Sequence, residues 1–226
     1  MSFIYPKPTI LVLSNNETIT TFYGHYYAEK FVSYARSKGY HVIHLVNPIL
    51  PDVQRAIFEY SPRLIIFFGL HGGELGVLGQ DRHVIAGVKG YDDELSLEIV
   101  RENIHWFSGK IVILLSCYSG SILGKELVER GHAEAVIGWK SPFFFVSSTI
   151  LSPEVDDKAR PFFKSVLVCM NGLVDGLTVG ESYHLMLRAF KKEAIKWLKI
   201  DQDIAKYLAF DRENAVMYGD FEARLI

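Results

Sequence analysis

Short apolar runs alternate with segments of helical periodicity through the first two thirds of the chain. Five runs predict strands, at residues 9–14, 41–46, 63–70, 110–116 and 133–138. Between them, apolar residues recur at helical spacing in four segments, 24–37, 52–60, 92–103 and 121–129. The runs at 64–70 and 110–116 are apolar on both faces, which is typical of strands in a sheet that is covered on both sides.

This alternation predicts an α/β fold. Right-handed crossovers between successive strands would give a mainly parallel, doubly covered sheet of about six strands, arranged in three layers. The C-terminal third adds predicted helices at 153–171 and 179–200 and a last strand at 214–217. Gly131 is expected to end the helix at 121–129 in the left-handed conformation. The chain has no repeat or linker, so we expect a single domain over residues 1–226.

Composition and charge exclude several classes of function. The chain has 24 Lys and Arg against 26 Asp and Glu, and this balance lacks the broad positive field that attracts nucleic acid or anionic lipid. No apolar run approaches the roughly 20 residues of a membrane span, and residues 1–8 lack the apolar core of a secretion signal. We therefore expect a cytoplasmic protein with neither nucleic-acid nor membrane partners.

The two cysteines are expected to be free thiols, because Cys117 and Cys169 could form at most one bridge and make no disulfide framework. Cys169 lies among apolar residues of a predicted helix, which indicates a buried structural thiol. The eight histidines show no His-x-x-x-His spacing, and no Cys-x-x-Cys pair is present. The sequence therefore predicts neither a metal site nor a cofactor.

Two of the buried strands are followed by chemically capable residues. The run LIIFFGL leads into His71-Gly72-Gly73, and the run KIVILLS leads into Cys117. In a parallel sheet the loops after the strands meet at one edge, and neighbouring strands lie about 4.8 Å apart. If the two strands are neighbours, the imidazole can take the proton of the thiol. The amides of Gly72 and Cys117 would then form an oxyanion hole, and a helix starting near Ser121 would favour the thiolate.

An apolar strand ending in His-Gly and a second one ending in a small residue and Cys resemble the caspase-like clan of cysteine peptidases (clan CD). His71 and Cys117 are 46 residues apart, close to the roughly 50 of caspases. Cys117-Tyr118-Ser119-Gly120 is similar to the Cys-x-Ser-Gly of several members. The later segment Gly176-Leu177-Thr178-Val179 resembles the turn that follows the core in CHAT and gingipain-like domains. The resemblance implies a caspase-like sandwich that cleaves peptide or protein substrates. It makes His71 and Cys117 the catalytic dyad and the Gly72 and Cys117 amides the oxyanion hole.

Other residues have open roles in this interpretation. A third catalytic member could be Asn15, Asn16 or Glu74, although the asparagines equally suit a turn and Glu74 a solvated loop. Leu115 stands two residues before the thiol, where the resemblance places Gln or Asp in charge-selective relatives. We therefore expect the residue before the cleaved bond to be uncharged or only loosely selected. Trp139 and the run 143–145 could wall an apolar substrate pocket or belong to the core.

Three functions remain open. The first is a cysteine endopeptidase acting through an acyl-enzyme, and the second is an interaction or signalling module that keeps the fold without turnover. The third is a thiol amidase or transferase on another strand order, which is separable because the first requires His71 and Cys117 to follow adjacent strands. The helix face from Arg188 to Lys199 carries five basic residues and suits either a docking face or a solvated one. The oligomeric state is not predicted.

Overall fold

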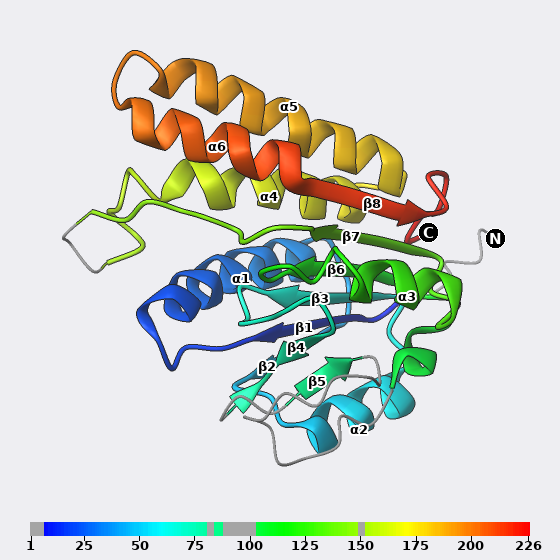
Figure 1. The fold of residues 1–226 in the computed structure, drawn as a ribbon. Helices are drawn as coiled ribbons and strands as arrows, with labels where there is room; N and C mark the ends of the chain where they lie inside the picture. Colours follow the sequence, from blue (N-terminus) through cyan, green and yellow to red (C-terminus); the bar gives the residue numbers. More distant parts are fainter. Residues whose placement is uncertain (1–6, 81–83, 88–102, 149–151) are drawn as a thin grey trace.

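A central sheet of six strands organises the protein in the computed structural model, which describes residues 7–80, 84–87, 103–148 and 152–226. The strand order is β2-β1-β3-β6-β7-β8 (Figure 1). The first five are parallel and β8 runs antiparallel to β7. Their bounds are β1 Ile10–Ser14, β2 Val42–Val46, β3 Leu64–Phe68, β6 Ile111–Leu115, β7 Ala135–Trp139 and β8 Ala215–Gly219. This confirms the predicted α/β fold with a mainly parallel sheet.

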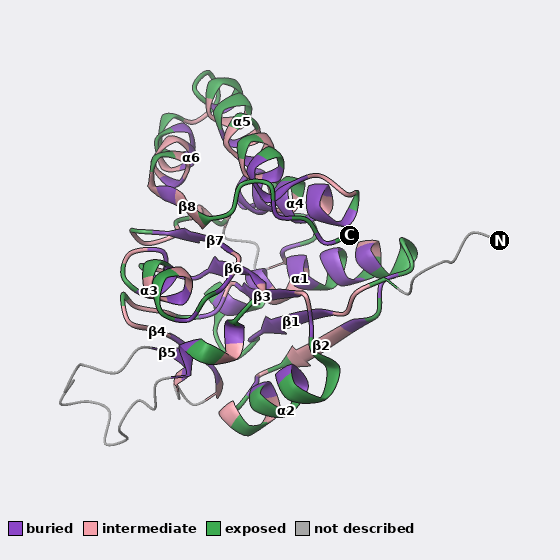
Figure 2. Ribbon diagram, turned by 90° about the vertical axis from the view of Figure 1, so that its right-hand side faces the viewer, coloured by how far each residue is buried: buried purple, intermediate pink, exposed green. Residues whose placement is uncertain are grey.

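Helices cover both faces of the sheet. Successive side chains of a strand point to opposite faces, so a strand that is apolar throughout needs a helical layer on each side. One core cluster joins the strands to α1 (Ile19–Ser37), α4 (Arg160–Val174), α5 (Val179–Trp197) and α6 (Gln202–Asn214). The second joins them to α2 (Leu50–Tyr60), α3 (Leu123–Glu129) and the 3-10 helix Ile104–Phe107. Figure 2 shows the four central strands buried between these layers, while the edge strands β2 and β8 are partly exposed and the outer helix faces are exposed. The result is a three-layer sandwich.

The outermost part of the molecule is a helical hairpin. α5 and α6 lie beyond α4 in Figure 1, and α6 leads directly into β8. Ala215, the first residue of β8, pairs with Trp139, the last residue of β7. The start of α6 therefore lies beyond the carboxyl end of β7, and the turn between the two helices projects past that edge of the sheet.

The structure departs from the sequence prediction at several elements. α6 had no predicted counterpart, and neither had the small antiparallel pair of β4 (Gly76–Leu78) and β5 (Val84–Gly87). α1 begins before the predicted start, whereas α3 and α4 begin after theirs. The prediction that Gly131 has the left-handed conformation was wrong, because the residue with a left-handed φ at this position of the chain is His132, at 56°. The helix predicted at 92–103 lies outside the described residues, apart from Asn103.

Helix α1 touches the chain that leaves β3 at the level of the backbone. A Cβ on Gly24 would lie 2.7 Å from Cα of Gly69, and Gly69 has a φ of +67°. Both positions therefore need glycine, one for space and one also for its backbone conformation. The contact fixes where the chain passes from β3 to His71, two residues further on.

No helix in the described part of the chain is long and apolar enough to cross a membrane.

Candidate thiol site at the carboxyl edge of the sheet

The two chemically capable residues follow adjacent strands. β3 and β6 are parallel neighbours with Phe68 opposite Leu115, and the N–H of Gly69 continues the ladder by donating to the carbonyl of Leu115 at 2.9 Å. His71 and Cys117 therefore follow neighbouring strands at the same sheet edge. Their side chains are exposed and half-buried, respectively. The strand order meets the geometric requirement of the Cys-His interpretation.

The turn after Cys117 is held by its own polar groups. Tyr118 has a φ of +59°, which is unusual for a residue with a side chain, and its N–H donates to the carbonyl of Ser141 at 3.2 Å. The hydroxyl of Ser119 donates to the carbonyl of Ser116 at 2.9 Å, and the N–H of Gly120 donates to the carbonyl of Trp139. Because these bonds tie the turn to β6 and to the end of β7, the thiol sits on a fixed support.

Gly72 packs against the residues that carry the thiol. A Cβ at this position would lie 2.8 Å from Oγ of Ser116 and 3.1 Å from the carbonyl oxygen of Cys117. Gly72 also forms an antiparallel bridge with Val77, whose hydrogen bonds come from the flanking residues: Gly73 N–H to Gly76 and Leu78 N–H to His71. In a bridge of this kind the N–H groups of the two bridged residues form no hydrogen bond across it, so the bridge does not use the N–H of Gly72. This geometry suits the predicted role of the Gly72 amide.

The expected low pKa of Cys117 was wrong in direction. Burial raises the pKa of the thiol above its ordinary value, and the nearby carboxyl of Asp211 raises it further. The N–H groups of Phe143 and of Cys117 itself stabilise the thiolate, but they do not offset burial. The expected help from a helix N-terminus also weakens, because α3 begins only at Leu123 and has seven residues.

Asp211 is a second ionisable group of this site, and no sequence motif marks it. It lies on α6 with 0% of its surface exposed, and its Oδ1 accepts the N–H of Phe144 at 3.0 Å. Its Oδ2 has no hydrogen-bond partner among the described residues. Burial raises the pKa of this carboxyl well above its ordinary value. Asp211 therefore holds the segment whose Phe143 amide reaches the sulfur.

Thr18 contacts the histidine ring. Its Oγ1 lies 3.4 Å from Nε2 of His71, and it is the N-cap of α1 in a capping box with Thr21. The loop after β1 reaches the histidine because β1 is the other neighbour of β3. Sequence reasoning missed Thr18, although Thr is a favoured residue at the N-cap of a helix.

The three residues considered as a third catalytic member have other partners. Asn15 folds its loop by accepting the N–H of Glu17 at 2.7 Å and the hydroxyl of Thr21 at 3.1 Å. Asn16 pairs with Asn47 in the loop after β2. The backbone carbonyl of Glu74 accepts the N–H of Leu123, while its side chain is exposed.

The two apolar candidates lie in the core. Leu115 and Trp139 are 1% and 0% exposed, and the indole N–H of Trp139 donates to the carbonyl of Asp211 at 3.0 Å. Neither offers surface to a substrate in this structure. In the run 143–145, Phe143 packs on Trp139 while Phe144 is partly exposed beside Tyr207 and Phe210. Phe144 is thus the member of the run that remains accessible.

Across the described ranges, no group of three or more His, Cys, Asp or Glu side chains is arranged to hold a metal ion. Comparison of the sequence with models of known protein families gives no match, and comparison with curated proteins gives none either.

Proposed function

We propose that the chain is a cysteine peptidase of caspase-like type, with Cys117 as nucleophile and His71 as proton carrier. The observation that carries the proposal is the pairing of β3 with β6, which brings the ends of the two strands to one edge. The packing of Gly72 against Ser116 and Cys117 supports it, since an amide there can face the carbonyl that the sulfur attacks.

The raised pKa of Cys117 specifies how the first step would proceed. The resting site holds a thiol rather than a preformed thiolate, so His71 takes the proton as the sulfur attacks the peptide carbonyl. The C–N bond then breaks, and His71 returns the proton to the departing amine. Water attacks the remaining thioester with His71 as base, which releases the acid and restores the thiol.

A peptide-library digest analysed by mass spectrometry tests this proposal. We expect the wild-type protein to cleave peptide bonds and Cys117→Ala and His71→Ala to abolish cleavage. Cys169→Ala and His184→Ala are the matched controls, because Cys169 is buried in α4 and His184 is exposed on α5. Cleavage that survives Cys117→Ala would assign the activity to another group and overturn the proposal.

A module without turnover is the second candidate, and the raised pKa of Cys117 is the observation that favours it. A thiol that stays protonated and half-buried suits a structural role as well as a poised nucleophile. Peptide-based electrophiles separate the two: a peptidase is modified at Cys117 by a peptidyl acyloxymethyl ketone, whereas a silent module reacts no faster with it than with the free warhead.

A further inference from the structure

The helical hairpin carries an open groove at its projecting end. A cavity of about 470 Å³ lies between α5 and α6. Its lining combines small and aliphatic side chains with a few polar ones: Ala194, Ile195, Leu198, Gln202, Asp203, Ala205, Lys206 and Ala209. The alanines keep the floor low, so that a ridge of side chains from another molecule can approach both helices. We call this cavity the hairpin groove.

Large aliphatic side chains gather around the hairpin groove. Ile195 and Leu198 are each 59% exposed, and Ile200, in the turn that follows, is 65% exposed. Single exposed aliphatic residues are ordinary, but three within six consecutive residues next to a cavity form a patch of the kind that marks interaction sites.

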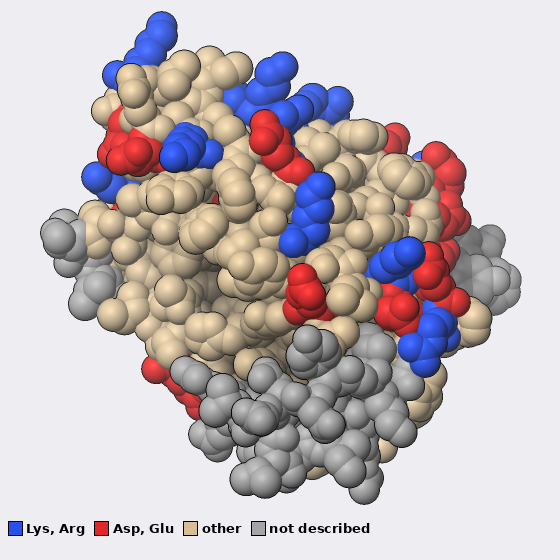
Figure 3. All heavy atoms as spheres, viewed as in Figure 1, with Lys and Arg blue, Asp and Glu red and all other residues tan. Residues whose placement is uncertain are grey.

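Basic residues continue the apolar stripe along α5. Lys191 and Arg188 precede Ile195 by four and seven residues, so helical spacing places them on the same face, one and two turns away. Among the described ion pairs, none includes Arg188, Lys191, Lys192 or Lys199. Figure 3 shows basic side chains gathered over the α5–α6 hairpin. One end of the stripe is thus apolar and the other is positively charged.

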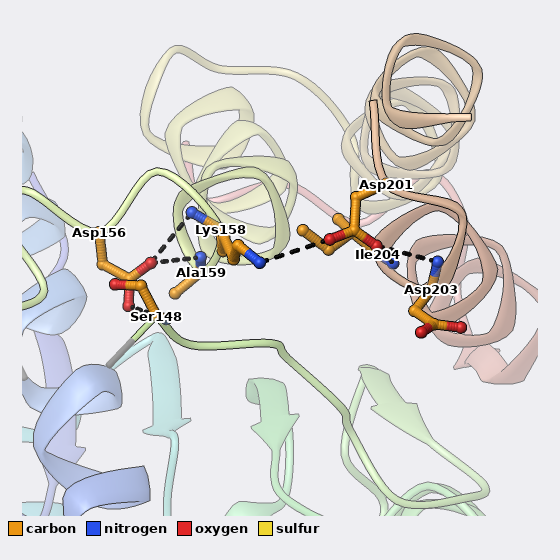
Figure 4. A network of polar contacts seen from close by, with 7 residues as sticks. All are labelled: Ser148, Asp156, Lys158, Ala159, Asp201, Asp203 and Ile204. Atoms are coloured by element: carbon orange, nitrogen blue, oxygen red, sulfur yellow. Dashed lines mark hydrogen bonds and ion pairs between the residues drawn. The ribbon is translucent and has the colours of Figure 1, made fainter. Parts of the chain in front are cut away.

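The hairpin groove is anchored to the rest of the fold. Asp201 caps α6 by accepting the N–H of Asp203 and Ile204, and Nζ of Lys158 reaches its other oxygen at 3.4 Å (Figure 4). The turn that carries Lys158 is held by Asp156, which accepts the N–H of Lys158 and of Ala159. These contacts hold the N-terminal end of α6 in place relative to α4. The groove therefore loses little conformational entropy when a partner binds in it.

We propose that the hairpin groove is a docking site for an amphipathic helix of a partner protein. The apolar face of that helix covers Ile195 and Leu198, and acidic residues one or two turns along it face Lys191 and Arg188. In helix-in-groove recognition the bound helix presents apolar anchors at i, i+3 or i+4, and i+7, and a groove between two helices that is lined partly by alanines can receive such a ridge. The end of the hairpin that carries the groove projects past the carboxyl edge of the sheet in Figure 1, and Cys117 follows β6 at that edge.

Two other occupants fit less well. In a symmetric pair of this chain the same face meets itself, so one concave groove would lie against another and neither would be filled. A lipid bilayer is flat, whereas the patch is concave and includes the carboxylate of Asp203, which anionic headgroups repel. A partner helix with an apolar face and acidic residues fits both the concave groove and the positive charge of Arg188 and Lys191.

Selection from a peptide library tests the docking site directly and does not depend on thiol chemistry. Helical peptides of about 16 residues, randomised at their surface positions and displayed on phage, are selected against the immobilised full chain. We expect enrichment of sequences with a helical apolar stripe and Asp or Glu toward one end. A synthetic consensus peptide should bind the double variant Ile195→Ser, Leu198→Ser at least roughly tenfold more weakly.

Two further variants sharpen the test. Lys191→Glu should weaken peptide binding and reduce its dependence on salt, whereas Phe58→Ser, which alters an exposed apolar residue of α2, should leave binding unchanged. Because Ile195, Leu198 and Phe58 are exposed, none of these changes removes a core side chain. Absence of enrichment, or equal binding to the double variant, overturns the proposal. So does wild-type binding to phosphatidylserine vesicles, or self-association in sedimentation, that the double variant loses while no peptide binds.

Discussion

The thiol of Cys117 experiences opposing influences from its immediate neighbours. Burial and Asp211 raise its pKa, while two backbone N–H groups lower it, and the balance favours the thiol. We expect iodoacetamide to alkylate Cys117 slowly at pH 6 and to accelerate only above about pH 8.5, the value of an ordinary thiol. Mass spectrometry of the labelled peptides across pH 6 to 10 measures this profile.

Cys169 provides the internal control for that experiment. It is buried in α4, and burial raises its pKa to about 12, so it should stay unlabelled in the folded protein at every pH tested. Rapid labelling of Cys117 at pH 6 would contradict the structure and indicate a thiolate paired with a cation, as the sequence alone had predicted.

Asp211 should contribute, after burial, to the pH at which the sulfur ionises. Burial raises the pKa of Asp211, so its charge opposes the thiolate only where the carboxyl is ionised. Asp211→Asn removes that charge and keeps an oxygen to accept the N–H of Phe144. The alkylation profile of Cys117 is therefore expected to move to lower pH in this variant. Glu213→Gln, at an exposed position of the same helix, is the matched control. A shift to higher pH would show instead that the carboxylate acts mainly by placing the Phe143 and Phe144 amides.

At the scale of elements, the turn after β3 and the turn after β6 meet at Gly72. Gly72→Ala brings a methyl group to 2.8 Å from Oγ of Ser116, so one turn must shift away from the other. If the proposed peptidase activity is present, this shift misplaces an oxyanion donor, and we expect hydrolysis to fall by roughly ten- to a hundredfold.

Gly73→Ala is the matched control for this contact, because a Cβ at Gly73 meets nothing within 4 Å. Steady-state rates of the two variants, with melting temperatures measured alongside, distinguish a local shift from unfolding. Equal rates for both variants would remove the Gly72 amide from the mechanism.

The sequence predicted the elements with strong periodicity and missed those that depend on tertiary contacts. β3 and β6 are apolar on both faces, and this signal alone placed them in a covered sheet. β4 has only three residues, too few to show alternation. α6 starts at a clear N-cap, Asp201, but its apolar positions are sparse and it gains stability from packing on α5.

The candidate site could be predicted only in part, for a physical reason. His71 and Cys117 stand at recognisable strand ends, so their placement on one edge follows from the alternation of strands and helices. Thr18 and Asp211 come from α1 and α6, far away in the sequence, and their arrival depends on strand order and on the hairpin. The pKa of Cys117 depends on burial, which a sequence pattern does not measure.

For the molecule as a whole, a pair of histidines near the β1–β2 edge should make stability depend on pH. The hydroxyl of Ser14 lies 3.0 Å from Nδ1 of His25 and 2.8 Å from Nε2 of His44, and Glu29 and Arg36 are the other charged groups that influence this pair. Burial, assisted by His25, lowers the pKa of His44 to about 4. The folded protein thus keeps His44 neutral where the unfolded chain would protonate it.

The sign of the effect follows from the proton balance. Between about pH 6.5 and pH 4 the unfolded chain binds more protons at His44, so the stability present above pH 6.5 is lost as the pH falls through this window. Urea unfolding of the wild type and of His44→Gln across pH 4 to 7 measures the contribution. The variant should lose less stability on acidification, whereas His132→Gln, an exposed control, should follow the wild type. Parallel curves for all three proteins would contradict the assignment.

The backbone contact between Gly24 and Gly69 has a mechanical consequence. No side chain lies between Gly24 of α1 and Gly69, which follows β3. The two backbones are therefore in direct contact, and no side chain can change its rotamer to absorb a shift of α1. The first turn of the same helix also touches the imidazole through Thr18. We therefore expect a displacement of α1 to reach the segment of His71 by two routes, the backbone contact at Gly69 and the side-chain contact of Thr18.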